Sequence, residues 1–457
     1  MADEAPATGG ASLPDLPDAT PVSVHLNRDF RVLWLARTMG QTAANTAQFG
    51  SLIVIVENTG SGFLSSIVVL SWVLPAALIS ILSGLIVDRV PKKWMLFVAN
   101  GLRASGCFVF ILSSQGTVEI FILVLFLASL GPFVGPAESA LVPTLVRREN
   151  LTAANAFLNL MRYVAQIAGL VVLAPVLVRV AGVDALFITT GALFAGSAVY
   201  SALIPMGVVT HHDSTDIEFP DEEARPRTKG LREARDFLRG NRAVWQAVVQ
   251  LALLAALLPL LLALTPVYVT EALDQKVSEL PVVIFPAILG MLFGLRMVSG
   301  LARSRDTAWL GTVGLAVFIG AVVALSLIDV WAEALENPLA LRGLDIGVIE
   351  ISRETQIVMI ILLPMGFAFS LVNVAANAIL NVRVPVGMQG RVFSLQTVMA
   401  GAASIPPLLI GGALTEILDV RIVLGISPVV LVLAWAFARF GTLNPRTARR
   451  RTAAAPQ

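Results

Sequence analysis

Charged residues are scarce in this chain. Asp, Glu, Lys and Arg make up only 14% of its 457 residues, whereas 56% are hydrophobic. Because water-soluble globular chains carry about a quarter charged residues, this composition excludes a soluble protein and, with it, a soluble enzyme. The net charge of +1 gives no indication of a nucleic-acid partner, and we expect none. The composition predicts a polytopic membrane protein.

Cysteine and histidine are almost missing. The lone Cys107 lies in an apolar run, which excludes a disulfide framework, a cysteine zinc site and an iron–sulfur cluster. The three histidines, His25, His211 and His212, lie outside the apolar runs. The sequence also lacks a Gly-rich loop ending in Gly-Lys-Ser/Thr, a His-Glu-x-x-His and a Gly-x-Ser-x-Gly. We therefore expect neither an ATP-driven pump nor an intramembrane enzyme, and no cofactor or metal.

What the sequence has in abundance is apolar runs of 20 or more residues. At 1.5 Å per residue, such runs cross a hydrocarbon core about 30 Å thick as helices. Twelve spans are predicted, near 31–56, 62–87, 94–114, 119–142, 152–179, 185–208, 243–269, 281–302, 308–328, 355–381, 391–416 and 422–440. With both termini cytoplasmic, 23 of the 32 basic residues lie inside, five outside and four within spans. The positive-inside rule thus predicts a multi-pass protein of the cell (cytoplasmic) membrane with this orientation.

The spans form two sets of six, which predicts an all-α membrane protein of two six-helix bundles related by pseudo-two-fold symmetry. The first bundle occupies 28–208 and the second 243–440. A charged cytoplasmic linker, 209–242, joins them, and a basic cytoplasmic tail follows at 441–457. Residues 1–27 contain four prolines and four acidic residues but no apolar segment, so we expect a disordered cytoplasmic tail and no cleavable signal.

Two loops carry amphipathic patterns. In Gly230–Arg242, four apolar residues share one helical face among arginines, namely Leu231, Ala234, Phe237 and Leu238. This pattern is compatible with a helix on the anionic membrane surface or with a solvated linker helix, and the sequence favours neither. The outer loop at 329–354 alternates apolar and acidic residues, and we expect a short interfacial helix there.

The most specific motif is "GLIVDRVPKKW", residues 84–94, between the second and third spans. It resembles the loop signature of the major facilitator superfamily. Gly84 permits close helix approach, and Asp88 can accept hydrogen bonds from the N-terminus of a facing helix, which in that family is the eleventh. An ordinary positive-inside loop would explain the basic residues but not Gly84 and Asp88. The resemblance implies an inner gate made of Gly84, Asp88, Arg89, Lys92, Lys93, Arg147 and Arg391.

The resemblance covers residues 28–440. The segments "FRVLWLARTMGQ", "GPAESALVPTLVRRENLTAANAFLN" and "VPVGMQGRVFSLQ" are similar to the branch of macrolide efflux proteins and the enterobactin exporter. It implies a monomeric secondary transporter, surrounded by membrane lipids, that exports an amphiphilic small molecule by alternating access and couples to protons. Two departures are Ala44-Asn45 in place of Gly-Asp and Glu138 in place of an arginine. The alternatives are a lipid or lysophospholipid flippase of the same fold and a non-transporting membrane receptor.

An ionisable residue well inside a span costs about 2.5 to 3.5 kcal/mol on insertion scales and therefore suggests function, and five such residues stand out. They are Arg37, Arg103, Glu138, Arg162 and Arg296. Glu138 is the one carboxylate clearly inside a span, so we predict that it carries the coupled proton. A permanent ion pair of Glu138 with Arg162 or Arg37 is the alternative. For Arg37 and Arg296, extension of the side chain to the interface is the simpler interpretation.

Four arginines against one glutamate favour an anionic or zwitterionic substrate, because guanidinium groups bind carboxylate or phosphate in a bidentate manner. Asn373, Asn377 and Asn381 share one face of the tenth span; they could line the pathway or bond to neighbouring helices. We assign the substrate cavity to Arg37, Asn45, Arg103, Arg162, Asn159, Asn373 and Asn377. Two Gly-xxx-Gly pairs, Gly131 with Gly135 and Gly290 with Gly294, are predicted to be packing sites.

Overall fold

The computed structural model describes residues 27–113, 116–146, 150–205, 233, 235–238, 240–304, 307–334, 344–345 and 350–440. Within this part of the chain the structure is built of helices, with one pair of two-residue strands. Eight of its helical stretches are long and apolar enough to cross a membrane, and one of these contains two spans. Together with α1, α2 and α15 they give the twelve predicted spans.

The first bundle contains α1 (Arg28–Thr59), α2 (Gly62–Arg89), α3 (Lys92–Ile111), α4 (Thr117–Ser129), α5 (Gly131–Leu145), α6 (Leu151–Gln166), the π-helical η3 (Ile167–Leu173) and α7 (Ala174–Leu203). The fourth span is α4 followed by α5. The fifth runs through α6 and η3 into the first turns of α7. The chain then turns back at Gly182, whose φ of 79° is readily available only to glycine, and the rest of α7 is the sixth span.

The second bundle contains α9 (Arg242–Glu271), the short η4 (Val277–Glu279), α10 (Leu280–Ser304), α11 (Thr307–Ser326), α13 (Arg353–Arg383), α14 (Val386–Leu414) and α15 (Val420–Phe440). The predicted short helix in the outer loop is present as α12 (Ile328–Ala334). The same loop carries an unpredicted antiparallel strand pair, β1 (Leu344–Asp345) with β2 (Glu350–Ile351).

Helix ends depart from the prediction mainly at prolines. The sixth span was predicted to reach 208, but α7 ends at Leu203, because Ile204 precedes Pro205 and adopts ψ of 122°. The eleventh was predicted to begin at 391, whereas α14 begins at Val386 directly after Pro385. Proline is well suited to this position because its φ is fixed and it has no N–H to satisfy.

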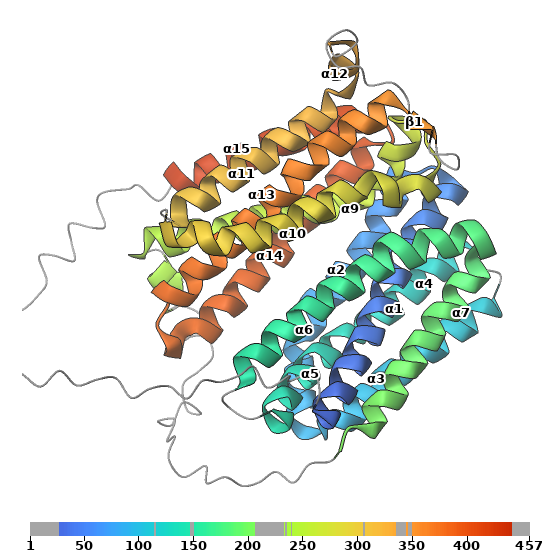
Figure 1. Cartoon of the computed structure of the whole chain (residues 1–457), viewed down its shortest axis with the longest axis vertical. Coiled ribbons are helices and arrows are strands. Elements are labelled where there is room, and N and C mark those ends of the chain that lie inside the picture. Colours follow the sequence, from blue (N-terminus) through green and yellow to red (C-terminus); the bar gives the residue numbers. More distant parts are fainter. Residues whose placement is uncertain are drawn as a thin grey trace, which may run out of the picture.

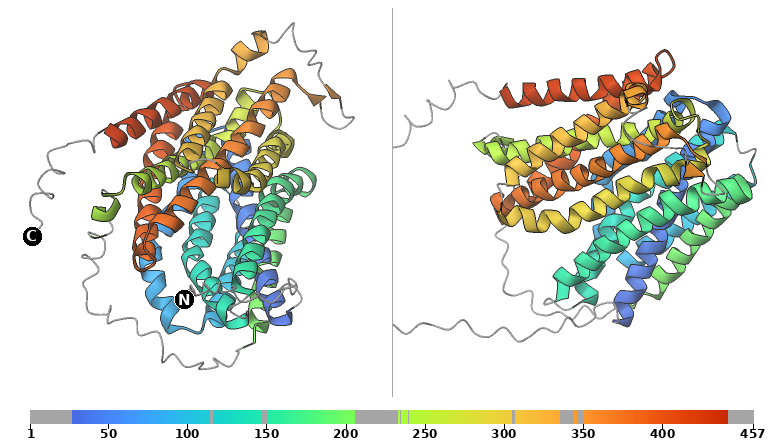
Figure 2. Two further views of the ribbon diagram at one scale, coloured as in Figure 1. Left: turned by 60° about the vertical axis from the view of Figure 1, so that its left-hand side comes forward. Right: turned by 45° about the horizontal axis from the view of Figure 1, so that its top comes forward.

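The two bundles approach each other at one end of the molecule, which we call the Ser61 end because α1 ends and α2 begins there. The helix pairs in contact across the boundary include α2 with α14, α2 with α9, and η3 with α10. Figure 1 shows the ribbons close together at this end and farther apart where α6 and α14 begin. Figure 2 shows α15, in red, at the edge of the second bundle away from the first.

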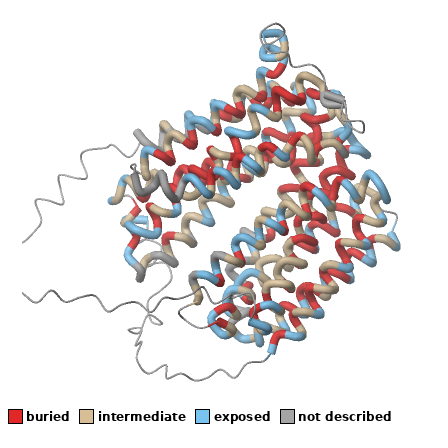
Figure 3. Tube along the Cα trace, viewed as in Figure 1, coloured by how far each residue is buried: buried red, intermediate tan, exposed pale blue. Residues whose placement is uncertain are grey.

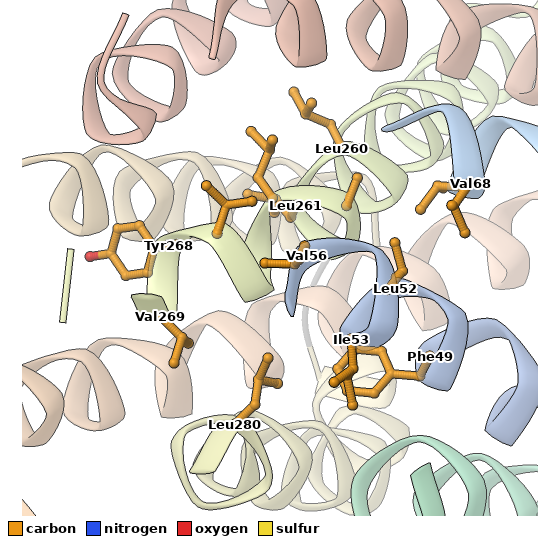
Figure 4. Packing of buried hydrophobic residues seen from close by; sticks show 14 of the residues in the cluster. Phe49, Leu52, Ile53, Val56, Val68, Leu260, Leu261, Tyr268, Val269 and Leu280 are labelled. Atoms are coloured by element: carbon orange, nitrogen blue, oxygen red, sulfur yellow. The ribbon is translucent and has the colours of Figure 1, made fainter. Parts of the chain in front are cut away.

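A continuous apolar core joins the bundles at the Ser61 end. Buried residues of α1 and α2 pack in one cluster with buried residues of α9 and α10. Figure 4 shows Val56 of the first bundle close to Leu261 of the second, and both belong to this cluster. In Figure 3 the buried positions lie along the interior of both bundles. The closed end is therefore held together largely by removal of apolar surface from solvent.

The end of the linker packs on the second bundle. Leu238 is fully buried in a cluster with residues of α9, α13 and α14, and Phe237 packs against the same cluster. Neither predicted alternative included this packing, which arises because α9 begins only four residues after Leu238 and holds the segment against its own bundle. Leu231 and Ala234 lie outside the described residues.

Candidate functional site

A cavity of about 240 Å³ lies between the bundles. That volume is close to the lower end of the roughly 300–1,000 Å³ usual for small-molecule sites. One wall comes from α6 and η3 of the first bundle, and the others come from α9, α10, α11 and α13 of the second. The lining residues are Tyr163, Gln166, Ile167, Leu170, Val171, Leu258, Leu261, Leu262, Thr265, Ile284, Ala287, Ile288, Met291, Phe318, Leu362, Met365, Gly366 and Phe369.

The cavity is apolar, with Tyr163, Gln166 and Thr265 as its polar side chains. The Thr265 hydroxyl donates to the carbonyl of Leu261, 2.5 Å away, so its proton is already used within α9. A ligand would thus meet mainly aliphatic, aromatic and thioether groups and a few polar ones. Three such polar groups can fix the orientation of a molecule whose bulk is apolar.

The first-bundle wall is shaped by the π-helical turn η3. Pro175 follows it and has no N–H to donate to the carbonyl of Val171, which favours an irregular turn just before it. A Cβ at Gly169 would lie 2.6 Å from the Thr42 carbonyl oxygen and 2.8 Å from the Asn45 Cβ, so only glycine allows η3 to pack this closely on α1. π-Helical turns are frequent at functional sites. Gly169 and Pro175 were the available sequence signals, but the turn itself was not predicted.

The second-bundle wall depends on close packing of α10 and α13. A Cβ at Gly294 would lie 2.8 Å from that of Ser370, and one at Gly290 would meet the carbonyl of Leu363. The Ser370 hydroxyl donates to the Met291 carbonyl at 2.7 Å. The prediction of a packing site is confirmed for this pair. It was wrong for Gly135, where a Cβ would meet open space.

A second polar feature of the first bundle is an ion pair within the spans. The Arg37 Nε lies 3.3 Å from the Glu138 Oε2, and the two side chains are 22% and 13% exposed. α1 supplies Arg37 and α5 supplies Glu138. Of the two partners left open by the sequence, the structure thus places Arg37 beside the carboxylate.

Arg103 is held in the interior next to this pair. It is 5% exposed, and its Nε donates to the Leu127 carbonyl at 3.1 Å. That carbonyl belongs to the last turn of α4, where helix carbonyls lack helical donors. The guanidinium lies 5.4 Å from the centre of the Phe194 ring, and its charge also interacts with that of Glu138.

Arg162 lies apart from that cluster and close to the cavity wall. Its side chain is exposed, and its guanidinium carbon lies 5.4 Å from the ring centre of Tyr163, a lining residue. Asn159, one turn earlier on α6, is also exposed. Arg296 is exposed on α10.

Two residues of the predicted asparagine stripe donate amide hydrogens within their own helix. The Asn373 Nδ2 donates to the Phe369 carbonyl at 3.1 Å, and the Asn377 Nδ2 donates to the Asn373 carbonyl at 2.8 Å. Asn45 is different, because it is 8% exposed and its Nδ2 has no hydrogen-bond partner in the described structure. It packs between α1 and η3, behind the cavity wall.

None of the seven residues assigned to the substrate cavity from the sequence lines the 240 Å³ cavity. Arg162 and Asn159 neighbour a lining residue, Arg37 belongs to the ion pair, and Arg103 is packed inside the first bundle. Their role in substrate contact stays a prediction. The apolar lining was not predicted, because its Leu, Ile and Met residues look in the sequence like any lipid-facing or core positions.

The structure gives a partial view of the predicted inner gate. The burial of Gly84, the side chain of Asp88 and all of Arg147 lie outside what the structure describes. Arg89 is exposed at the end of α2, and the Lys93 Nζ lies 5.9 Å from the Trp94 ring centre. Arg391, in the second turn of α14, forms an ion pair with Glu233 of the linker, with 3.0 Å between Nη1 and Oε2. Glu233 was not singled out from the sequence.

A family model for the Major Facilitator Superfamily matches residues 34–405. The chain belongs to the Major Facilitator Superfamily. As a member of it, the protein is a multi-pass membrane transporter of a small molecule rather than an enzyme, with the predicted fold of twelve helices in two bundles.

Solved structures show the same fold. A mutant of the nucleoside transporter NupG matches with a TM-score of 0.68 and 13% identity over 91% of this chain and 99% of that one. A bacterial homologue of the human lysosomal transporter Spinster, inward-facing and unoccupied, matches with 0.68 and 14% over 91% and 96%. A bacterial homologue of the iron transporter ferroportin, inward-facing, matches with 0.64 and 15% over 92% and 100%. No curated protein matches in sequence. At these identities the likeness shows the superfamily fold and leaves the substrate open.

Proposed function

We propose that this transporter exports an amphiphilic small molecule from the cytoplasm by alternating access. The observation that carries the proposal is the cavity between the bundles, with apolar walls from both of them and three polar side chains. In transporters built of two such halves, the bundles rock against each other around a site at their interface. Because the walls of this cavity belong to both bundles, its shape and its access to either side of the membrane change when the bundles move.

The direction of opening supports binding of the substrate from the cytoplasmic side, as export requires. The count of Lys and Arg assigns the Ser61 end to the outside. The bundles are packed together at that end, by the apolar core and by contacts of α2 with α14. The described conformation is therefore, on this topology, the inward-facing one. Export is further supported by the sequence resemblance to efflux proteins.

Proton coupling is proposed to run through Glu138. Protonation would neutralise the carboxylate and remove the partner of Arg37, which lies within a span and is only 22% exposed. An unpaired guanidinium in such a place is costly, so the proton changes the balance between conformations that differ in access of water to Arg37. Because Arg162 is exposed beside the lining residue Tyr163, an anionic or zwitterionic amphiphile is the favoured substrate class.

The experiment uses two adjacent residues of α13. Leu362 lines the cavity, whereas Leu363 is 49% exposed on the surface. Proteoliposomes containing Leu362→Trp should lose efflux of fluorescent anionic or zwitterionic amphiphiles under a pH gradient, because the indole fills the site. Leu363→Trp should transport like the unmodified protein. Equal transport by both variants, with both stably folded, would place the substrate elsewhere.

A further inference from the structure

The Ser61 end holds a polar contact between the bundles that the family signature does not include. It lies on the seam between α2 and α14, where the helices approach at glycines. A Cβ at Gly412 would lie 2.5 Å from that of Ser66, and a Cβ at Gly62 would lie 3.0 Å from that of Thr415. The two backbones can come this close only because these positions carry no side chain.

Glu416 lies just beyond α14 and reaches across this seam. The Ser61 hydroxyl donates to its Oε1 at 2.6 Å, and the Phe63 backbone N–H donates to the same oxygen at 3.3 Å. Its own position is fixed by the turn that ends α14, in which the Glu416 N–H donates to the Ala413 carbonyl at 3.3 Å. A carboxylate of the second bundle is thus bonded to the first turn of a first-bundle helix.

The bonded groups form the N-terminal cap of α2. Ser61 is its N-cap residue, and its Oγ accepts from the Leu64 N–H at 3.0 Å while donating to Glu416. The first turn of a helix has backbone N–H groups without helical acceptors, together with the positive end of the helix dipole. An anion placed there forms charge-assisted hydrogen bonds, which are stronger than neutral ones. Separation of the bundles at this end would leave this cap incomplete.

We propose that Glu416 is an outer latch. Its carboxylate holds α2 to α14 in the described conformation, and the bonds to Ser61 and Phe63 must break before the bundles can separate at the Ser61 end. Glu416 is a positioning residue and takes no part in substrate binding. The inference rests on the proposed alternating access, but it concerns the conformational equilibrium and can be tested without any substrate.

The test measures two distances by double electron–electron resonance between nitroxide labels. One pair, at Asn58→Cys and Lys276→Cys, joins exposed positions of the two bundles near the Ser61 end. The other, at Thr144→Cys and Val382→Cys, joins exposed positions at the opposite end. The native cysteine, Cys107, is buried and should not be labelled.

Glu416→Gln removes the charge but keeps an acceptor oxygen, so it should increase the population with a long Asn58–Lys276 distance by about fivefold, the difference expected between a hydrogen bond to a charged acceptor and one to a neutral acceptor. The Thr144–Val382 distance should shorten in the same population. A merely structural residue would broaden both distributions without this opposite change.

Asp419→Asn is the matched control. Asp419 also caps a helix, accepting from the Arg421 N–H at 2.8 Å, but that helix is α15 of its own bundle. It should leave both distributions unchanged. If Glu416→Gln does not fold, Glu416→Asp, whose side chain is one methylene shorter and loses the bonds to Ser61 and Phe63, gives the same comparison and should also open the Ser61 end. Identical distributions for the position-416 variant and the control would overturn the latch, whether or not the protein proves to be an exporter.

Discussion

Arg37 and Glu138 lie on different helices of the first bundle, 3.3 Å apart, and each is the other's ion-pair partner within the spans. The pair gives Glu138 a defined environment within its span, and Arg103 of α3 adds a second positive charge to it. Removing either member of such a pair leaves an uncompensated charge, which is more costly than replacing both. The pair is therefore sensitive to a single proton.

The first prediction concerns this proton. Glu138→Gln keeps the shape of the side chain but cannot ionise, so accumulation driven by a pH gradient should be abolished. Movement of the substrate down its own concentration gradient should persist in part, because the cavity walls do not include Glu138. Flux in proteoliposomes, with and without an imposed gradient, measures both. Glu333→Gln, an exposed carboxylate on α12, is the control. Unchanged gradient-driven flux in Glu138→Gln would remove Glu138 from coupling.

Arg103 should act mainly on stability. Its Nε bonds to the Leu127 carbonyl at the end of α4, and its guanidinium lies over Phe194. Lysine keeps the charge but lacks the planar group, so Arg103→Lys should lower the free energy of unfolding by roughly 1.5–3 kcal/mol, the range for a hydrogen bond to a charged group. A thermal melt in detergent measures this. A melting temperature equal to that of the unmodified protein would contradict the interior role.

Arg162 should act on ligand binding instead. It is exposed beside Tyr163, which lines the cavity, so Arg162→Lys should leave the melting temperature unchanged. Binding of an anionic amphiphile should weaken by roughly 1–3 kcal/mol, because the bidentate contact is lost, and Arg162→Gln should weaken it further. Titration calorimetry with matched anionic and cationic amphiphiles measures the difference. Equal binding of a cation and an anion to all three proteins would return Arg162 to a structural role.

The sequence predicted the fold well because the fold depends on local signals. Hydrophobic run length gave the twelve spans, and the motif at 84–94 identified the superfamily. The observed helix ends differ from the predicted ones where a proline sets the boundary, as at Pro205 and Pro385.

The site was predicted less well because its contacts join distant segments. Glu416 and Ser61 are 355 positions apart, and Glu233 and Arg391 are 158 apart, so no periodicity could pair them. The intramembrane charges stood out in an apolar sequence, and Arg37 and Glu138 do meet. The cavity lining did not stand out, because an apolar residue that faces a cavity has the same composition signal as one that faces lipid.

The last prediction separates two contacts that hold the linker on the second bundle. The Glu233–Arg391 ion pair is partly solvated, with side chains 50% and 28% exposed, whereas Leu238 is fully buried among residues of α9, α13 and α14. Exposed ion pairs contribute about 0–1 kcal/mol, whereas truncation of a buried leucine to alanine costs about 2–5 kcal/mol.

Leu238→Ala should therefore release the linker and make it much more sensitive to limited proteolysis. Glu233→Gln should change the cleavage rate by less than about fivefold, as expected for about 1 kcal/mol. Arg235→Gln, at an exposed position of the same segment, controls for altered cleavage sites. If Glu233→Gln released the linker as fully as Leu238→Ala, the ion pair would contribute at least as much to this attachment as the buried leucine. The Glu233–Arg391 pair would then stabilise the attachment by more than the roughly 0–1 kcal/mol expected of an exposed ion pair.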